Sequence, residues 1–353
     1  MELLFNAEGI LKRGKGLTFD DVLLFPKHTT LNSRRDPELS CQVTKKRRLK
    51  IPLISANMDT VTELEMACTM ARLGGLGILH RFMTIEEQAK QCRQLRDYIE
   101  KNNLEIPVAA SIGVNKEGQE RANLLVESGA EILTIDIAHG DSELMFKTLD
   151  YVKTTFPQIE VIAGNTATPE GVRGMIEHGA DAIKIGIGPG SMCTTRIITG
   201  CGVPQLTAIA LAAHEAKKHD VPIIADGGLK TSGDMVKALA VGADTMMLGS
   251  LFSGCLETPG KVSGGKKKYR GMASKDAQVS WRGNLPKGMA AEGVDVFVTC
   301  KGSAEDVAHE LIGGIRSGMS YLNAYNLREL QEHASFMKIS PQGMNESKPH
   351  GAL

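Results

Sequence analysis

The segment from Gly186 to Ile209, GIGPGSMCTTRIITGCGVPQLTAI, holds the strongest combination of residues that could do chemistry. Cys193 lies within it, among glycines and immediately before Thr194, Thr195 and Arg196. A nearby cation and exposed backbone amides favour the thiolate form of a cysteine, which is the form that attacks electrophilic carbon. Most single cysteines are inert buried residues, but the polar surroundings of Cys193 predict a nucleophile.

The same loop is also suited to holding a phosphate group or a cation. Its glycines allow backbone amides to approach a ligand closely, or carbonyl oxygens to face a cation, and a serine adds a hydroxyl group. Two more glycine-rich stretches, residues 226–228 and 249–250, follow later strand-like runs. Phosphate sites of barrel enzymes commonly lie there, so the three stretches together predict a phosphate site, although tight turns alone would also need glycine. The loop positions concerned are Gly186, Gly188, Gly190 and Ser191.

Eight apolar runs of strand length recur along the chain and would position these residues. They are nearly continuous in apolar residues, which is typical of parallel strands covered on both faces. Amphipathic segments, such as residues 84–103 and 231–241, lie between them and predict helices. The eight runs are residues 51–56, 76–80, 108–113, 132–138, 161–165, 182–187, 222–228 and 245–250.

A short sequence pattern that recurs three times supports repeated strand and helix units. ESGAEILTID, EHGADAIKIG and AVGADTMMLG each show a helix end, a glycine, a small residue, an acid and then a strand. Glycine can adopt the left-handed conformation that ends a helix and leads directly into the next strand. The pattern predicts an α/β fold, a (β/α)₈ TIM barrel with a flap insertion after strand eight.

Chemistry in such a barrel takes place at the C-terminal ends of the strands. Seven of the eight runs end in polar or glycine-rich residues, which favours a site over a purely structural barrel. These ends are Asn57-Met58-Asp59, His80-Arg81, Asp136 with His139, Asn165, and residues 186–193, 226–228 and 249–250.

We expect one barrel domain over residues 1–353. Residues 252–302 interrupt the alternation of strands and helices, and their glycines and lysines predict a mobile active-site flap. Residues 340–353 are polar and rich in proline and glycine, which predicts a disordered tail.

Composition excludes several classes of function. The 41 Lys and Arg balance 41 Asp and Glu, so the chain lacks the positive excess of a broad nucleic-acid surface. It has no apolar run near the ~18 residues of a membrane span, and its N-terminus has no signal-peptide cleavage site. Its seven cysteines form neither a CxxC metal motif nor a disulfide framework. We therefore expect a cytoplasmic protein that binds neither nucleic acid nor membrane.

Other charged residues have weaker claims to a role. Lys266–Lys268 is expected to be a solvated patch, with contact to a cofactor phosphate as the alternative. His80 and His139 could be general bases, but no paired acid lies near them in sequence, so a turn or structural role is expected. Glu292, in the glycine-bearing flap, could pass a proton or hydrogen-bond a base edge. Lys184 could form a Schiff base in an unrelated phosphate-binding barrel, but this would leave the cysteine loop unexplained.

The chain resembles the IMP dehydrogenase and GMP reductase family. GPGSMCTTR followed by GVPQLTAI is similar to the family's nucleophile loop, and the resemblance covers about residues 17–330. Supporting matches are LTFDDVLLFPK (17–27), PLISANMDTVTELEMA (52–67), DIAHG (136–140), AGN (163–165), IIADGG (223–228), MMLGSLFSG (246–254), YRGM (269–272), AEG (291–293) and GGIRSGMSY (313–321).

The resemblance implies that Cys193 attacks carbon 2 of a purine nucleotide and forms a thioimidate, while a nicotinamide exchanges hydride with the same carbon. Thr195 and Glu292 complete the catalytic set that it implies. Asp226 would bind the ribose hydroxyls. The substrate-binding residues that it implies are Ser55, Met58, Asn165, Ser191, Asp226, Gly227, Gly228, Gly249, Ser250, Tyr269, Gly271, Met272 and Gly293.

The same resemblance implies a nicotinamide cofactor, a potassium ion and a homotetramer with cofactor sites shared between subunits. The potassium ion would be surrounded by the carbonyls of Gly188, Gly190 and Cys193, with Arg196. The implied cofactor-binding residues are Ser33, Arg34, Arg81, Asp136, Ile137, Ala138, Gly186, Gly188, Ser317 and Ser320.

The two branches of the family differ in how the thioimidate is resolved. Family dehydrogenases hydrolyse it, usually with an Arg-Tyr pair on a longer flap, and usually insert a regulatory domain pair after strand two. Neither feature is visible here, and Trp281-Arg282 is the nearest substitute. A reductase needs only Cys193, Thr195 and Glu292 together with NADPH.

The compact flap favours an NADPH-dependent GMP reductase, which converts GMP to IMP and ammonia in purine nucleotide interconversion. YRGM and LTFDDVLLFPK are closer to dehydrogenases, and Met289 stands where reductases carry arginine. The alternatives are an IMP dehydrogenase without regulatory domains, which converts IMP to XMP with NAD, and a nucleotide-binding barrel without catalysis.

Overall fold

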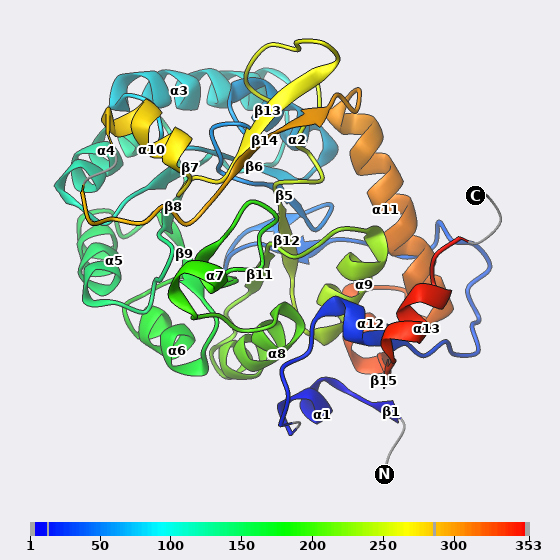
Figure 1. The fold of residues 1–353 in the computed structure, drawn as a ribbon. Coiled ribbons are helices and arrows are strands. Elements are labelled where there is room, and N and C mark those ends of the chain that lie inside the picture. The colour runs from blue at the N-terminus through cyan, green and yellow to red at the C-terminus, as the bar shows by residue number, and fades with distance from the viewer. Residues whose placement is uncertain (1–3, 13, 285–286, 350–353) are drawn as a thin grey trace.

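The computed structural model describes residues 4–12, 14–284 and 287–349 (Figure 1). Eight parallel strands close into a barrel in the order β10-β11-β12-β5-β6-β7-β8-β9. Each strand overlaps one of the eight predicted runs, so the predicted (β/α)₈ TIM barrel is confirmed. The barrel strands are β5 (Leu53–Ser55), β6 (Leu76–Leu79), β7 (Ala109–Ile112), β8 (Ile132–Asp136), β9 (Glu160–Thr166), β10 (Ala182–Ile185), β11 (Ile223–Asp226) and β12 (Thr245–Leu248).

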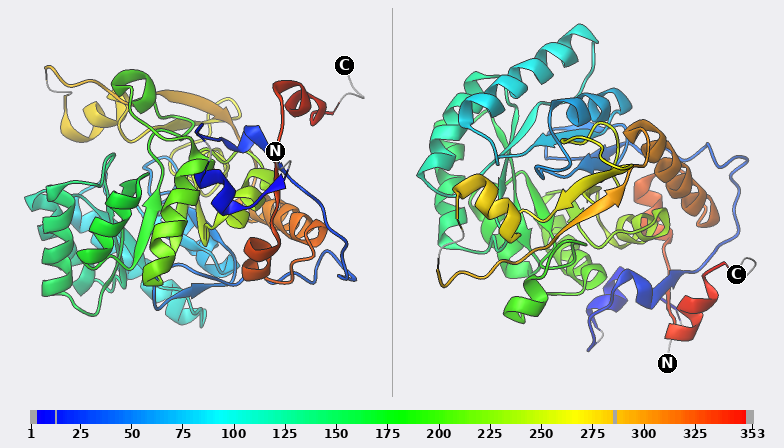
Figure 2. Two further views of the ribbon diagram at one scale, coloured as in Figure 1. Left: turned by 90° about the horizontal axis from the view of Figure 1, so that it is seen from below. Right: turned by 45° about the horizontal axis from the view of Figure 1, so that its top comes forward.

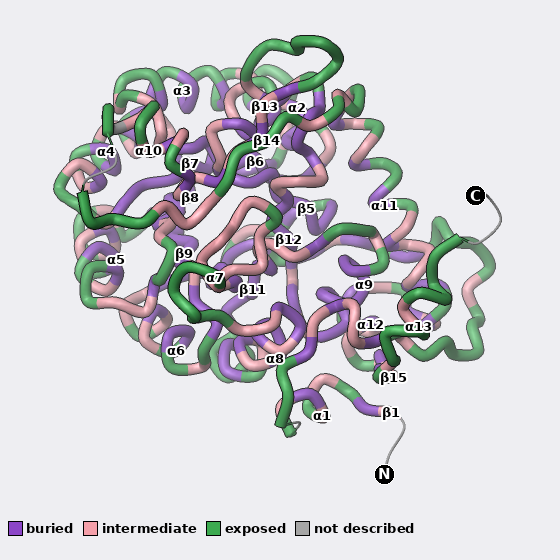
Figure 3. The backbone as a smooth tube through the Cα atoms, viewed as in Figure 1, coloured by how far each residue is buried: buried purple, intermediate pink, exposed green. Residues whose placement is uncertain are grey.

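The barrel strands carry apolar side chains on both faces because both faces are covered. Every residue of β6, β7, β10 and β12 is buried. One face points into the barrel and the other packs under the surrounding helices, as expected for parallel strands. The buried tube at the centre of Figure 3 follows these strands. Removing this apolar surface from water, at roughly 25 cal/mol per Å², is the main force that closes the barrel.

The connecting helices begin and end at signals that the sequence carries. Thr84 and Thr231 each accept a hydrogen bond from a backbone amide in the first turn of their helices. Gly129, Gly179 and Gly242 have φ of +94°, +91° and +125°, which confirms the predicted glycine turns. The helices are α2 (Leu64–Leu73), α3 (Ile85–Lys101), α4 (Lys116–Glu127), α5 (Glu143–Thr155), α6 (Pro169–Glu177), α7 (Thr195–Thr199), α8 (Gln205–Ala216), the 3₁₀ turn η2 (Lys217–His219) and α9 (Ser232–Val241).

The predicted flap segment lies across the end of the barrel at which α7 is found (Figure 2). It contains a hairpin of β13 (Lys266–Arg270) and β14 (Asp295–Thr299), with α10 (Lys275–Arg282) between the two strands in sequence. The hairpin is antiparallel and pairs Arg270 with Asp295. Its connecting residues are thereby brought over the C-terminal ends of the barrel strands.

The remaining elements lie beside the barrel. They are a small sheet of β1 (Leu4–Phe5), β15 (Phe336–Lys338) and β2 (Val22–Leu24), a pair of β3 (Cys41–Gln42) and β4 (Arg48–Leu49), the 3₁₀ turn η1 (Phe19–Asp21), and α1 (Ala7–Leu11), α11 (Ala304–Tyr321), α12 (Leu327–His333) and α13 (Pro341–Glu346). None of the helices in the described part of the chain combines the length and the apolar character that a membrane crossing requires.

One prediction about the C-terminal segment is corrected. Residues 340–353 were expected to be disordered, yet Pro341–Glu346 forms α13. Ser340 accepts a hydrogen bond from the Gly343 amide, and proline fits the first turn because its missing N–H needs no partner there. Residues 350–353 lie outside the described residues.

Candidate active site

The C-terminal ends of the barrel strands open into a cavity of about 450 Å³ beneath the flap. A cavity of this size is typical of small-ligand sites. Each of the seven polar or glycine-rich strand ends contributes to its wall. Strand-end residues in the wall include Asn57, Arg81, Asp136, Asn165, Gly186, Asp226 and Gly249, and the flap contributes Tyr269, Gly271, Met272, Ala273, Gln278 and Glu292.

Cys193, Thr195 and Glu292 form one hydrogen-bonded chain in the wall of the cavity. Cys193 Sγ donates to Thr195 Oγ1 at 3.1 Å, and Thr195 Oγ1 donates to Glu292 Oε2 at 2.7 Å. The Thr194 amide donates to the Glu292 carbonyl at 3.1 Å, so the backbone holds the flap against the cysteine loop. The structure therefore brings together the three residues that were predicted to be catalytic.

This chain of groups can move a proton between sulfur and carboxylate. A hydroxyl group both donates and accepts, so Thr195 can pass the thiol proton to Glu292. Loss of that proton leaves a thiolate, the nucleophilic form of cysteine. In the reverse direction, Glu292 can return a proton through Thr195 to a leaving group next to the sulfur.

The predicted phosphate stretches converge at one end of the same cavity. Gly227 and Gly228 have φ of +85° and +79°, a conformation that favours glycine. A Cβ atom at Gly249 would lie 2.8 Å from the hydroxyl of Tyr269, so this position also has no room for a side chain. Ser191 Oγ lies 3.3 Å from the same hydroxyl. Burial raises the pKa of Tyr269 to about 12, so the phenol stays neutral and can donate a hydrogen bond.

The floor of the cavity contains a buried cation between two carboxylates. Lys184 Nζ lies 3.0 Å from Asp136 Oδ1 and 2.5 Å from Asp226 Oδ2, and it also bonds Asn165 Oδ1. Asn57 Nδ2 donates to Asp136 Oδ2 at 2.7 Å. Burial alone would raise the pKa of Asp136, but the charge of Lys184 and the Asn57 bond hold it below its ordinary value.

The same pairing argues against the Schiff-base alternative. Burial alone would lower the pKa of Lys184, but the two carboxylates raise it above its ordinary value. A Schiff-base lysine reacts as the neutral amine, so a lysine held in the charged form is poorly suited to that chemistry.

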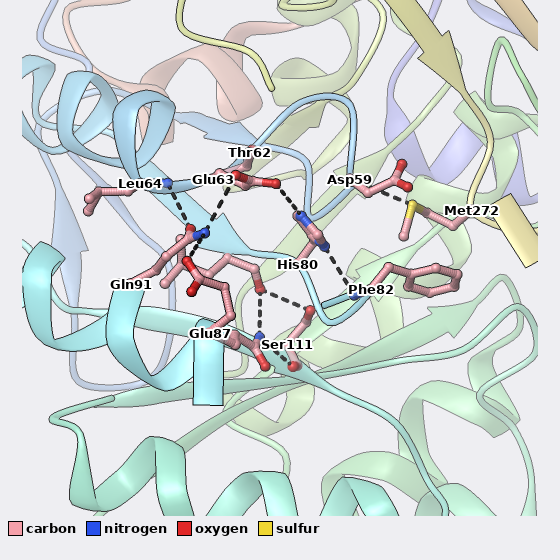
Figure 4. Close-up of polar contacts among 12 residues, drawn as sticks. Asp59, Thr62, Glu63, Leu64, His80, Phe82, Glu87, Gln91, Ser111 and Met272 are labelled. Atoms are coloured by element: carbon pink, nitrogen blue, oxygen red, sulfur yellow. Dashed lines mark hydrogen bonds and ion pairs between the residues drawn. The ribbon is translucent and has the colours of Figure 1, made fainter. Parts of the chain in front are cut away.

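One wall of the cavity is held by a histidine whose partner the sequence did not reveal. No acid lies near His80 in sequence, but in the fold its Nε2 lies 3.1 Å from Glu63 Oε1, as Figure 4 shows. The Phe82 amide donates to His80 Nδ1 at 3.0 Å, which places the ring proton on Nε2. The hydrogen bond from His80 lowers the pKa of Glu63. His80 is therefore a structural residue that fixes the turn carrying Arg81 and Phe82, which both line the cavity.

Trp281 ties the flap helix to this wall. Its ring centroid lies 5.9 Å from that of Phe82, and the guanidinium carbon of Arg121 lies 5.9 Å from the Trp281 ring. Trp281 does not line the cavity. This placement does not support Trp281 as part of a group that activates water, while the side chain of Arg282 lies outside the described residues.

Several predicted site residues lie outside the cavity lining. Ser55 is buried and its hydroxyl accepts a hydrogen bond from Thr62. Gly293 pairs through its backbone with Cys193, directly beside Glu292. His139 is exposed and does not line the cavity. The remaining group comprises Ser33 and Arg34, which follow β2, and Ser317 and Ser320 on α11, a helix that lies across the molecule from α10 in Figure 1.

This remaining group is held together by contacts of its own. The guanidinium carbon of Arg34 lies 6.0 Å from the Tyr321 ring, and Ser320 Oγ donates to the Ser317 carbonyl at 2.7 Å. None of these side chains reaches the cavity of its own chain. These four residues therefore cannot bind a cofactor in the cavity of their own chain, and their predicted role in cofactor binding stays a prediction.

The predicted potassium loop is stabilised by Arg196. Arg196 Nε donates to the Ile187 carbonyl at 3.1 Å, and its terminal nitrogen donates to the Val203 carbonyl at 2.5 Å. A guanidinium is itself a cation and offers no lone pair, so a potassium ion here would depend on main-chain oxygens. Within the described residues there is no cluster of His, Cys, Asp and Glu with the arrangement of a metal site.

The cavity also contains residues that the sequence did not single out as site residues. Phe82 directly follows Arg81, so its place after a strand was a usable signal. Gln278 lines the cavity from α10 and donates to the Met272 carbonyl at 2.9 Å. No local pattern marks Gln278, because only the folding of the flap over the barrel brings it there.

Comparisons with known proteins agree with this geometry. The model of the IMP dehydrogenase / GMP reductase domain matches residues 16–350. The chain belongs to the IMP dehydrogenase/GMP reductase family. Members of this family are oxidoreductases that use nicotinamide cofactors. The resemblance seen in the sequence is thereby confirmed.

Relatives of the chain carry both names of the family. Inosine-5'-monophosphate dehydrogenase of Cryptosporidium parvum is 42% identical over 385 residues, which cover 96% of this chain and 95% of the relative. The same enzyme of Nitrosopumilus maritimus is 35% identical over 470 residues, covering 96% and 99%. Among solved structures, a Cys-to-Ala variant of GMP reductase from Trypanosoma brucei in complex with guanosine 5'-monophosphate superposes with a TM-score of 0.89 at 31% identity, covering 99% of this chain and 100% of that one.

Proposed function

We propose that this protein is a GMP reductase, which converts GMP to IMP and ammonia with NADPH. The observation that carries the proposal is the chain of hydrogen bonds from Cys193 through Thr195 to Glu292 at the cavity wall. It supplies the nucleophile and the proton transfer that deamination requires, without any further base.

The reaction balances with these groups, a hydride from the cofactor and a proton from water. Cys193 sulfur bonds to carbon 2 of the purine, and its proton passes through Thr195 and Glu292 to the departing amine, which leaves as ammonia. A nicotinamide cofactor supplies a hydride to the same carbon when it is bound. The carbon–sulfur bond then breaks, IMP is released, and the thiolate takes a proton from water to restore Cys193.

The nucleotide is proposed to lie with its phosphate against the glycine-rich ends of β11 and β12. Backbone amides near Gly228 and Gly249 and the hydroxyl of Ser191 suit a phosphate group. Asp226, which is 23% exposed at the floor, suits the hydroxyls of the ribose. Met272 of the flap would then lie against the base. The bound guanosine 5'-monophosphate of the Trypanosoma brucei structure supports a nucleotide of this kind.

A reductase is favoured over a dehydrogenase by the compact flap. A dehydrogenase must activate water to hydrolyse the thioimidate. The flap's described tyrosine and arginine, Tyr269 and Arg270, have other partners: the Tyr269 hydroxyl lies beside Ser191, and Arg270 is bound by Asp59 and Asp276. The alignment with the Cryptosporidium parvum enzyme spans 385 residues, more than the 353 of this chain, so that enzyme has residues without counterparts here. The reductase structure also matches this chain over nearly the full length of both.

The cofactor, the ion and the assembly are further parts of the proposal. NADPH would enter beside Asp136 and Arg81, opposite the nucleotide. Carbonyls of the cysteine loop, with the positive φ of +79° at Gly188, suit a potassium ion that would steady the loop. Arg34 and Ser317, which do not reach the cavity of their own chain, would serve the cofactor site of a neighbouring subunit in a homotetramer.

An IMP dehydrogenase that converts IMP to XMP with NAD is the second candidate. It is favoured by the dehydrogenase names of the relatives and by the YRGM motif at residues 269–272. Thr195 and Glu292 would then have to activate water themselves.

Absorbance at the nicotinamide band distinguishes the two reactions. Purified protein with GMP and NADPH should oxidise the cofactor and release ammonia, while protein with IMP and NAD should not produce NADH. Turnover with the second pair alone would refute the reductase assignment. Replacement Cys193→Ala should abolish turnover in either case, and binding of GMP without oxidation of NADPH by the wild type would indicate a barrel that has lost catalysis.

A further inference from the structure

Lys184 is a deeply buried cation that reaches several strands at once. It lies in β10, and its side chain is 2% exposed. Its ammonium group contacts Asp136 at the end of β8, Asn165 on β9 and Asp226 at the end of β11. These four strands are neighbours in the eight-stranded barrel, so one side chain links the ends of half of its strands.

The two carboxylates approach Lys184 from the ends of β8 and β11. Asp136 and Asp226 are 26% and 23% exposed, so each keeps part of its carboxylate open to the cavity. Asp226 Oδ2 accepts from both Lys184 and Asn165, whereas among the described residues none donates to Asp226 Oδ1. Asp136 places Oδ1 toward Lys184 and Oδ2 toward Asn57.

We propose that Lys184 is a positioning residue that couples the nucleotide half of the site to the cofactor half by keeping both carboxylates ionised and oriented as acceptors for sugar hydroxyls. The inference rests on the proposed function, in which Asp226 faces the nucleotide ribose and Asp136 the ribose beside the nicotinamide. Lys184 acts through the two carboxylates and does not take part in the chemistry.

The reason is electrostatic. Both carboxylates lie within 3.0 Å of the same ammonium nitrogen, so they are close neighbours of like charge. Without the cation between them, such a pair takes up a proton and one member becomes neutral. The other charged group that acts here is Arg81, whose charge favours ionised Asp136, and Asn165 is a neutral amide that donates to Asp226. Neither contacts both carboxylates as Lys184 does.

The test compares Lys184→Gln with the wild type and with Lys237→Met. Lys237 is also a buried lysine, but its ammonium group donates to the Phe19 carbonyl at 2.8 Å, away from the cavity. Lys184→Gln should raise KM for both GMP and NADPH, by on the order of tenfold or more, because both carboxylates lose their orientation. Lys237→Met should lower thermal stability and leave both KM values within about twofold.

The pH profile separates this role from a merely structural one. In Lys184→Gln, KM for GMP should rise more steeply with falling pH than in the wild type, because two close carboxylates without the cation between them take up a shared proton. A second variant, Lys184→Gln with Asp136→Asn, removes the repulsion. It should return KM for GMP toward the wild-type value and keep KM for NADPH high.

Unchanged KM values and a flat profile in Lys184→Gln would overturn the proposal, as would failure of the double variant to recover GMP binding. If Lys184→Gln does not fold, comparing the double variant with the single variant Asp136→Asn still shows how Lys184 affects both KM values when residue 136 is uncharged. Calorimetric titration with GMP reports nucleotide affinity without turnover. A wild type that binds GMP but does not oxidise NADPH would therefore refute the proposed function while leaving the role of Lys184 testable.

Discussion

Arg270 joins the flap to the barrel through a nearly buried ion pair. Its Nε lies 3.0 Å from Asp59 Oδ2, a terminal nitrogen bonds the same oxygen, and the other terminal nitrogen bonds Asp276 on α10. The side chains of Arg270 and Asp59 are only 13% and 7% exposed. The Asp59 amide also donates to the Met272 sulfur at 3.3 Å (Figure 4). We predict that Arg270→Met releases the flap from the barrel.

The size of the effect follows from the burial of Asp59. Removing one partner of a buried ion pair leaves the other charge without compensation, which costs about 3 kcal/mol or more. Loss of the second ion pair, between Arg270 and Asp276, adds less than about 1 kcal/mol to this cost, because the Asp276 carboxylate is 35% exposed. Since 1.4 kcal/mol corresponds to a factor of ten, the docking equilibrium of the flap should shift toward the open form by roughly 100-fold. Glu292 reaches Cys193 only from the docked flap, so kcat/KM should fall as well.

Amide hydrogen exchange measured by mass spectrometry reports this equilibrium directly. Exchange over residues 266–299 should accelerate by about two orders of magnitude in Arg270→Met, and fluorescence of Trp281, the single tryptophan, should change as it leaves Phe82. Arg328→Met is the matched control, because its pair with Glu332 is exposed and should change exchange less than twofold.

A double variant isolates the charge effect. Arg270→Met with Asp59→Asn leaves no uncompensated carboxylate, so flap protection should recover part of the way to the wild type. Flap exchange in Arg270→Met within about twofold of the wild type would refute the assignment of this ion pair as the anchor of the flap.

Glu292→Gln retains a hydrogen-bond acceptor but cannot carry the proton. We therefore expect kcat to fall about 100-fold or more, while KM for GMP changes only a few-fold. A larger effect on KM than on kcat would contradict the role of Glu292 in proton transfer. Iodoacetamide should alkylate the half-buried Cys193 and the exposed Cys201, as measured by peptide mass spectrometry. Added GMP should protect Cys193 but not Cys201 from alkylation. Equal protection of the two cysteines would argue against a nucleotide bound at Cys193. Burial raises the pKa of Asp244 from 3.8 to about 6, so its contribution to stability is full below about pH 4 and is lost as pH rises through 6. Asp244→Asn should therefore gain up to about 3 kcal/mol over the wild type by pH 7 in urea unfolding, and a difference that is independent of pH would exclude this titration.

The barrel could be predicted because its signals are local. An apolar run such as residues 182–187 must lie between two covered faces, and glycines such as Gly179 mark the turn before the strand. Both features depend on a few neighbouring residues, so they are visible before the chain folds. The helix α13 was missed because the amphipathic pattern used for the other helices is absent there, and only the cap at Ser340 and the proline after it mark its start.

In the candidate site, too, the residues that are adjacent in the chain could be predicted from their spacing, and those that are remote in sequence could not. Composition and spacing around Cys193 were enough to identify the nucleophile loop, because its glycines, serine and cysteine are adjacent in the chain. Glu292 was considered as a proton carrier because of its glycine-bearing segment, but only the family resemblance joined it to Cys193 and Thr195, since 97 residues separate it from Thr195. The partner of His80 was missed, because Glu63 precedes it by 17 residues and approaches it only when β6 packs beside α2.

The sequence by itself therefore determined the barrel, its chemically active end and the cysteine that is the candidate nucleophile. Only the tertiary structure decided how charge is distributed around that cysteine. Lys184 pairs with two carboxylates, and Arg270 meets Asp59 across 211 positions of the chain. The physical reason is that Coulomb and hydrogen-bond energies depend on distance and burial, and closure of the barrel and flap sets both for residues that are remote in sequence.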